Sequence, residues 1–171
     1  DISEAETGTL RLQLEKVVVA DLIDEVVDLY QYVAEDKGVA ISVTCDENIL
    51  ITADRNRFIQ VLANLLDNAI KYSEPGKKVD LVVEDLPREI AVHVHDQGCG
   101  IERKHLDRLF ERFYRVDKAR SRKLGGTGLG LAIVKHIMQA HQGEVSVKSQ
   151  VGAGSTFTLH IPKGPNTNKH L

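Results

Sequence analysis

One stripe of polar residues on a predicted amphipathic helix offers ligands for a cation and for phosphate. Asn64, Asn68 and Lys71 lie at i, i+4 and i+7, so they share one helix face, with Tyr72 beside Asn68. Amide oxygens bind hard cations, and a lysine attracts phosphate. The stripe indicates a magnesium and phosphate edge, while an ordinary solvated helix surface remains the alternative for this stripe taken alone.

An aspartate at the end of a predicted strand could recognise a base. Asp96 closes the strand over 90–96 and is followed by Gly98 and Gly100. A carboxylate accepts a hydrogen bond from an amino group, such as the exocyclic amine of adenine, and repels phosphate. The glycines let the backbone turn and approach a flat ligand closely. Because Asp and Gly also occur in any turn, this motif alone leaves base recognition and a simple turn open.

A glycine-rich helix entry follows a basic loop. The stretch GGTGLG, residues 125–130, opens a predicted helix, and a glycine-lined helix N-terminus can bind an anion. Its spacing fits neither a Walker loop nor a dinucleotide fingerprint, which would require a glycine in place of Leu131. The preceding loop has one acid, Asp117, and carries the bases Arg115, Lys118, Arg120, Arg122 and Lys123. It predicts either a lid over a polyphosphate or a solvated loop.

These residues must be positioned by a mixture of helices and strand pairs. Apolar spacing predicts main helices over 19–37, 55–73 (with Asp54 as N-cap) and 131–140, and a short helix over 102–110. Alternation predicts paired strands at 39–45 with 49–53, 79–85 with 90–96, and 144–149 with 155–162. This order predicts an α+β fold, a two-layer sandwich with three main helices on one face of a mixed, mostly antiparallel sheet of about five strands plus a small hairpin.

Composition narrows the class of protein. The 171 residues are 42% hydrophobic and 27% charged, as in a soluble globular domain. No apolar run approaches the ~18 residues of a membrane span, and the N-terminus does not resemble a signal peptide. The net charge of −3 argues against nucleic-acid binding, and Cys45 and Cys99 lack metal or disulfide spacing. We therefore expect a cytoplasmic domain with free thiols and no direct membrane contact.

Five ordered motifs resemble those of the catalytic ATP-binding domain of bacterial sensor histidine kinases. They lie within roughly residues 38–162 and read NLLDNAIKYS, DQGCGI, LFERFYR, GGTGLGLAIVKH and GAGST. The resemblance implies a Bergerat-type sandwich of the gyrase, chaperone, histidine kinase and MutL superfamily, with ATP bound under a lid. It also implies Mg²⁺, and transfer of the γ-phosphoryl group to a histidine on a separate dimerisation domain, for signalling to a response regulator receiver domain.

The resemblance assigns catalytic roles to four residues. Asn68 matches the magnesium ligand, and Asn64 supports the metal and the phosphates. Lys71 resembles a phosphate contact, and Arg115 resembles an arginine that reaches phosphate when the lid closes. Asn64, Asn68, Lys71 and Arg115 are therefore the expected catalytic residues.

The same motifs imply the nucleotide pocket. Asp96 matches the adenine-reading aspartate, Tyr72 a contact on the nucleoside side, and Phe110 an aromatic residue that helps to position the lid. The family often has threonine where this chain has Ser155, which keeps the hydroxyl. The other implied nucleotide-binding residues are Gly98, Gly100, Ile101, Phe113, Tyr114, Gly126, Thr127, Gly128, Leu129, Gly130, Leu131, Ser155 and Thr156, with Gly152 and Gly154 in the last motif.

Asn64 separates phosphoryl transfer from hydrolysis. Related gyrase and chaperone ATPases carry a glutamate there that activates water, whereas an amide cannot take a proton. Asp67 is a nearby carboxylate, but at i, i+4 from Lys71 we expect the two to pair. Two alternatives to transfer remain: a nucleotide-sensing module that binds without transferring, and a hydrolytic ATPase domain.

The phosphoacceptor is missing from the chain. None of the seven histidines lies in a predicted helix directly before an acidic residue, as the acceptor of the family does. We expect residues 1–18 to be the tail of a dimerisation helix with its linker, 19–162 the ATP-binding domain and 163–171 a disordered tail. The isolated chain is expected to be a monomer that binds ATP and does not phosphorylate itself.

Overall fold

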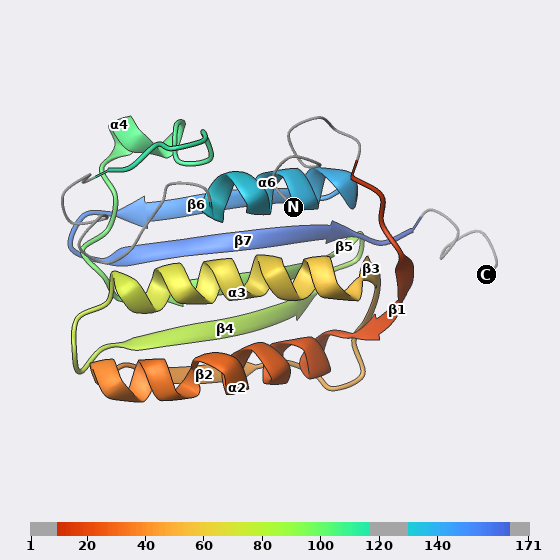
Figure 1. Cartoon of the computed structure of the whole chain (residues 1–171), viewed down its shortest axis with the longest axis horizontal. Helices are drawn as coiled ribbons and strands as arrows, with labels where there is room; N and C mark the ends of the chain where they lie inside the picture. The colour runs from red at the N-terminus through yellow and green to blue at the C-terminus, as the bar shows by residue number, and fades with distance from the viewer. Residues whose placement is uncertain (1–9, 117–129, 165–171) are drawn as a thin grey trace.

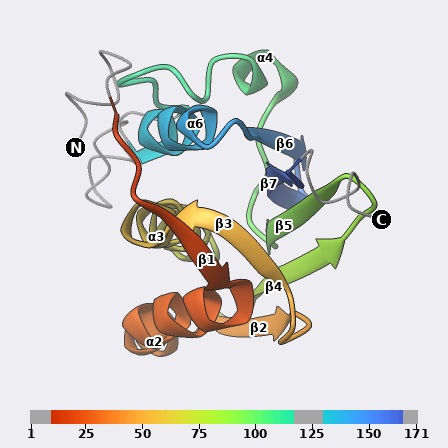
Figure 2. The same ribbon diagram turned by 90° about the vertical axis from the view of Figure 1, so that its right-hand side faces the viewer.

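The computed structural model describes residues 10–116 and 130–164. One mixed sheet has the strand order β2-β4-β5-β7-β6, and three helices cover one of its faces (Figures 1 and 2). The strands are β2 (Ala40–Thr44), β4 (Lys78–Asp85), β5 (Glu89–Asp96), β6 (Glu144–Gln150) and β7 (Gly154–Pro162); the helices are α2 (Val19–Lys37), α3 (Arg55–Lys71) and α6 (Gly130–Ala140). The predicted α+β sandwich is confirmed.

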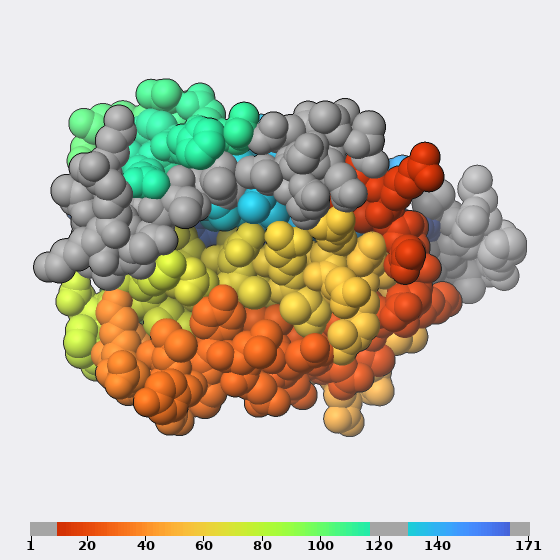
Figure 3. All heavy atoms as spheres, in the orientation of Figure 1, coloured from red at the N-terminus to blue at the C-terminus, as the bar shows by residue number. Residues whose placement is uncertain are grey.

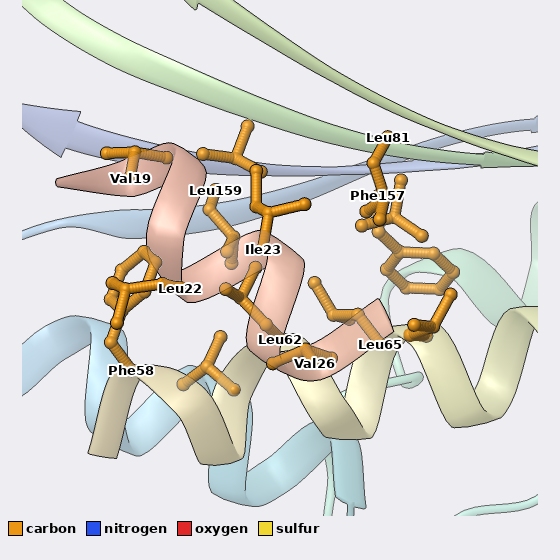
Figure 4. Packing of buried hydrophobic residues seen from close by; sticks show 14 of the residues in the cluster. Val19, Leu22, Ile23, Val26, Phe58, Leu62, Leu65, Leu81, Phe157 and Leu159 are labelled. Carbon is orange, nitrogen blue, oxygen red and sulfur yellow. The ribbon is translucent and has the colours of Figure 1, made fainter. Parts of the chain in front are cut away.

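The core lies between the helices and the sheet. Each helix contributes residues at helical spacing and each strand alternate residues, which follows from the two periodicities. Figure 4 shows part of this layer, in which α2, α3 and the sheet contribute the buried side chains Leu22, Ile23, Val26, Phe58, Leu62, Leu65, Leu81, Phe157 and Leu159. The core holds α3 firmly, and the opposite side of α3 forms the molecular surface between α2 and α6 (Figure 3).

Asp54 caps α3 as predicted. Its Oδ1 accepts a hydrogen bond from the backbone N–H of Arg57 at 3.1 Å. Its Oδ2 accepts another from the backbone N–H of Gln13 at 2.9 Å. One carboxylate therefore fixes both the start of α3 and the entry of the chain into the domain.

Asp54→Ala should lower the free energy of unfolding by about 1 to 2 kcal/mol, because α3 loses its cap and Gln13 loses an acceptor. Urea denaturation of both proteins measures the difference. Asp28→Ala, at an exposed position on α2, is the control and should change the free energy by less than about 0.5 kcal/mol. Similar losses in the two variants would contradict the capping role.

The predicted hairpin of 39–45 with 49–53 is wrong. β2 instead pairs in parallel with β4 at the edge of the main sheet. The second strand, β3 (Leu50–Asp54), pairs with β1 (Leu14–Val18), a strand that the sequence analysis did not predict. The alternation of apolar and polar residues predicted both segments as strands, but it did not predict which neighbouring strand each one pairs with. The other two predicted pairs, β4 with β5 and β6 with β7, are confirmed as antiparallel.

Two smaller expectations also differ from the structure. The short helix is only α4 (Arg103–Leu106), and hydrogen bonds to the third residue back, such as Arg108 N–H to His105 O at 3.0 Å, continue the segment as turns. Lys163 was expected in the disordered tail. Its backbone N–H donates to Arg88 O at 2.9 Å and its Nζ lies 2.6 Å from Asp85 Oδ1. Residues 165–171 lie outside the described part.

Candidate functional site

The predicted site residues gather at one end of the sandwich, on the left in Figure 1. Here α3 ends, α6 begins, and β5 ends beside the start of β7 with Asp96 opposite Ser155. The amide nitrogen of Asn64 lies 3.4 Å from Gly130 O, which joins the middle of α3 to the first residue of α6. Segments far apart in the sequence thus form one edge between the helices and the sheet.

The polar stripe of α3 faces this edge. Asn64, Asn68, Lys71 and Tyr72 are each partly exposed. Within the described part of the chain, the side chain of Asn68 has no hydrogen-bond partner. Lys71 Nζ lies 2.9 Å from Asp67 Oδ2, which confirms the expected pairing. An ammonium has three donors, so Lys71 can keep this partner and still donate to a phosphate.

Lys37 holds the end of the stripe, a contact that sequence reasoning did not predict. Its ammonium donates to Ile70 O at 3.0 Å and also to Lys71 O. These are carbonyls of the last helical turn, which lack partners within the helix. The basic last turn of α2 was visible in the sequence, but the helix that it would contact was not.

Asp96 is a buried carboxylate held by two backbone donors. Only 7% of the surface of Asp96 is exposed to solvent. Oδ1 accepts hydrogen bonds from Gly98 N–H at 2.9 Å and from Ser155 N–H at 3.2 Å. Burial raises the pKa of Asp96 above the ordinary value of an aspartate, although the two donated hydrogen bonds oppose the shift. The carboxylate is therefore fixed in orientation, with Oδ2 left to meet another donor.

Two glycines after Asp96 permit close approach of the backbone. A Cβ on Gly98 would lie 2.8 Å from Tyr72 O, at the end of α3. Gly100 has a φ of 79°, and a Cβ there would lie 2.2 Å from Gln150 O. Any larger residue would push α3, β5 and β6 apart at the site.

The segment after α4 presents its aromatic residues in different directions. Phe110 packs edge-to-face against Phe157, with 6.2 Å between the ring centroids, and so anchors the segment on β7. Phe113 is 57% exposed and has a φ of 64°, a strained conformation for a bulky residue. The hydroxyl of Tyr114 bonds to His105 Nδ1. Arg115 follows at a partly exposed position at the end of the described segment.

The remaining predicted residues lie in different places. Ser155 faces Asp96, but Thr156 points to the opposite face of the sheet, where its Oγ1 lies 2.6 Å from His95 Nδ1. Thr156 therefore does not lie with the other predicted residues. Ile101 and Leu131 are half-buried against the core. The predicted lid, with Gly126, Thr127, Gly128 and Leu129, lies outside the described residues.

The fold and this edge define a nucleotide-binding α+β domain, and comparison with known proteins names the family. A family model described as histidine kinase-, DNA gyrase B- and HSP90-like ATPase matches residues 53–165. The chain belongs to this family. The sensor-like histidine kinase SenX3 of Mycolicibacterium smegmatis is 41% identical over 164 residues, which are 95% of this chain and 43% of SenX3.

Solved structures of histidine kinases have the same fold as this chain. The nucleotide-free catalytic domain of the histidine kinase ThkA superposes with a TM-score of 0.79 at 28% identity, over 90% of this chain and 100% of that one. ThkA has also been solved with the response regulator TrrA, with a TM-score of 0.78 at 25% identity over 98% of this chain and 47% of that one. Full-length ShkA with AMPPNP has a TM-score of 0.77 at 30% identity, over 90% of this chain and 32% of that one.

The curated relatives are longer than this chain. It spans 43% of SenX3 and 28% of the sensor protein SrrB of Staphylococcus aureus. Among the described residues, no helix combines the length and the apolar character that crossing a membrane requires.

Proposed function

We propose that this chain is the ATP-binding catalytic domain of a sensor histidine kinase. It binds Mg-ATP at the edge between α3, α6 and the ends of β5 and β7, and transfers the γ-phosphoryl group to a histidine on a separate dimerisation domain. The observation that carries this proposal is the pairing of Asp67 with Lys71 beside the amides of Asn64 and Asn68. The stripe thus offers ligands for metal and phosphate, and its one carboxylate is already held by a lysine.

The nucleoside end of the proposed site is Asp96. Its Oδ1 is engaged by backbone donors, so Oδ2 is the oxygen that accepts from the exocyclic amine of adenine. Gly98 and Gly100 let the backbone beside this carboxylate pack closely against the end of α3 and the end of β6. The proposed site therefore distinguishes ATP from a polyphosphate by a single directed hydrogen bond to a buried carboxylate, where such a bond is strong.

The phosphate end of the site is the α3 stripe. Mg²⁺ that is bound through nucleotide phosphates keeps several waters and needs only one or two protein oxygens. The amide of Asn68, with Asn64 one turn away, can supply these oxygens. When bound, the ion would neutralise charge on the β- and γ-phosphates during transfer. Lys71 and Arg115 donate to phosphate oxygens and orient the γ-phosphoryl group toward the incoming imidazole. Gly130, at the start of α6, adds the positive end of a helix dipole.

Transfer is favoured over hydrolysis for a chemical reason. Hydrolysis needs a base that takes a proton from water, and an amide at position 64 cannot serve. A histidine nucleophile needs mainly positioning and charge neutralisation, which the stripe supplies. A module that binds nucleotide without transferring it would not require this complete set of ligands.

The deciding experiment mixes the purified chain with a separately made histidine hairpin of a cognate kinase and labelled Mg-ATP. We expect acid-labile phosphate on the hairpin and none on the chain itself. Binding without transfer to any cognate hairpin would favour the nucleotide-sensing alternative, and release of inorganic phosphate at the same rate without a hairpin would favour hydrolysis. Labelled phosphohistidine on the chain would contradict the expected absence of an acceptor.

The proposal extends to partners and location. ThkA forms a complex with its response regulator, and we propose that the full-length protein likewise passes its phosphoryl group to a receiver domain. We propose that the isolated domain is a monomer, that it works in the cytoplasm, and that it binds neither nucleic acid nor membrane.

A further inference from the structure

Ser149 lies on β6 at a place where the strand pattern predicts an apolar residue. Val145 and Val147 pack against the core opposite Leu159 and Phe157. Ser149 is the next member of this inward-facing row and lies opposite Ser155. A hydroxyl in such a row is expected to have specific hydrogen-bond partners.

The hydroxyl of Ser149 connects two loops. Oγ accepts a hydrogen bond from the backbone N–H of Ile101 at 2.7 Å. It lies 3.1 Å from Gly154 O and 2.8 Å from Ser155 Oγ. The loop that follows Asp96 is thereby tied to the first two residues of β7, directly after the loop that joins β6 to β7.

These loops surround the buried carboxylate of Asp96. Ser155 N–H donates to Asp96 Oδ1, and a second link between the loops runs from Gly152 N–H to Cys99 O at 2.8 Å. The two glycine motifs therefore meet through hydrogen bonds, and Ser149 supplies the side-chain connection between them.

The direction in which the Ser149 hydroxyl donates its proton also determines whether Ser155 can donate to a ligand. When Ser149 donates to Gly154 O, Ser155 can donate to Ser149 Oγ and offers only lone pairs to a ligand. When Ser149 donates to Ser155 Oγ, the proton of Ser155 is free for the ligand. The pair can thus present either an acceptor or a donor next to Asp96.

We propose that Ser149 is a positioning residue for the nucleoside end of the site, which rests on the proposed function. It sets the spacing of the two loops and the direction of the Ser155 hydroxyl, and through them the affinity for the base. It does not touch the phosphates, so its effect is confined to ligands that carry a base.

Calorimetric titration of Ser149→Ala with ADP tests this role. Loss of one half-buried hydroxyl with three hydrogen-bond partners should weaken ADP binding about tenfold, whereas tripolyphosphate affinity should stay within about threefold of the unsubstituted chain. Ser149→Thr keeps the hydroxyl and should restore ADP affinity, and Ser149→Cys, a weak hydrogen-bonding group of similar shape, should not. Ser146→Ala is the matched control, because Ser146 lies on the same strand, is exposed and bonds only to His160 among described residues.

Unchanged ADP affinity in Ser149→Ala and Ser149→Cys would overturn the inference, as would equal losses for ADP and tripolyphosphate. Failure of Ser149→Thr to recover binding, with its thermal unfolding unchanged, would also count against it. If the unsubstituted chain itself bound no ADP, the proposed function would fall, and this inference with it.

Discussion

Asn68→Ala is expected to lower the rate of phosphoryl transfer to the histidine hairpin at least about 100-fold. The amide oxygen of Asn68 is the proposed protein ligand of Mg²⁺, and alanine would leave the ion without this ligand, with only Asn64 on the stripe to support it. Because Asn68 has no hydrogen-bond partner in the described part of the chain, its removal should cost the fold little. Initial rates with labelled Mg-ATP measure the effect.

Two comparisons distinguish a role of Asn68 in metal binding from a general effect of the substitution on the domain. Asn48→Ala changes an exposed asparagine in the turn before β3, far from the stripe, and should transfer at the original rate. Binding of ADP in the presence of a chelator should change less than about threefold in Asn68→Ala, since the base contacts remain. Transfer near the original rate in Asn68→Ala would remove Asn68 from the proposed mechanism.

Asp96→Asn should weaken ATP binding roughly 10- to 100-fold while leaving tripolyphosphate binding unchanged. The amide oxygen can replace Oδ1 and accept from Gly98 and Ser155, so both loops should keep their positions. The amide nitrogen then replaces Oδ2 and presents a donor to the exocyclic amine of adenine, which is itself a donor. Calorimetric titration with the two ligands measures the difference.

Asp80→Asn is the control for this substitution, because Asp80 lies on the neighbouring strand with its side chain bonded to Ser42. It should bind ATP as the unsubstituted chain does. Equal losses for ATP and tripolyphosphate in Asp96→Asn would argue that Asp96 shapes the site without recognising the base.

The pH dependence of stability gives a separate check on Asp96. Since burial raises the pKa of Asp96 in the folded chain, the folded state holds this proton more tightly than the unfolded state. The contribution of Asp96 to the free energy of unfolding is therefore fully present below the unfolded pKa and lost as the pH rises through the folded pKa. Relative to Asp96→Asn, the unsubstituted chain should lose stability in urea denaturation as the pH rises above about 4, the ordinary pKa of an aspartate, and through the higher pKa of the folded state.

Much of the local structure follows from short stretches of the chain. The apolar spacing of α3, its cap at Asp54 and the pairing of Asp67 with Lys71 involve residues within one or two helical turns. The pairs β4 with β5 and β6 with β7 join neighbouring segments through short turns. Such elements could be predicted because the residues that interact are close in sequence.

The motifs also predicted which residues form the site, and the structure places one of them, Thr156, away from Asp96. Adjacent residues of a strand point to opposite faces, so Ser155 and Thr156 could not both face Asp96. The alternation of β7 already contained this information. The inward row of β6 likewise marked Ser149 as unusual, although nothing local to β6 named its partner in the loop after Asp96.

Only the tertiary structure decided the remaining contacts, because their partners are distant in the chain. Alternation identified β2 and β3 as strands, but the edge that each one joins depends on where β4 and β1 lie. The same holds for Lys37, whose carbonyl partners are 33 and 34 residues away. The sequence by itself determined the elements and the chemistry available at the site; tertiary packing determined which of those groups face one another, since side-chain periodicity specifies a face and not its partner.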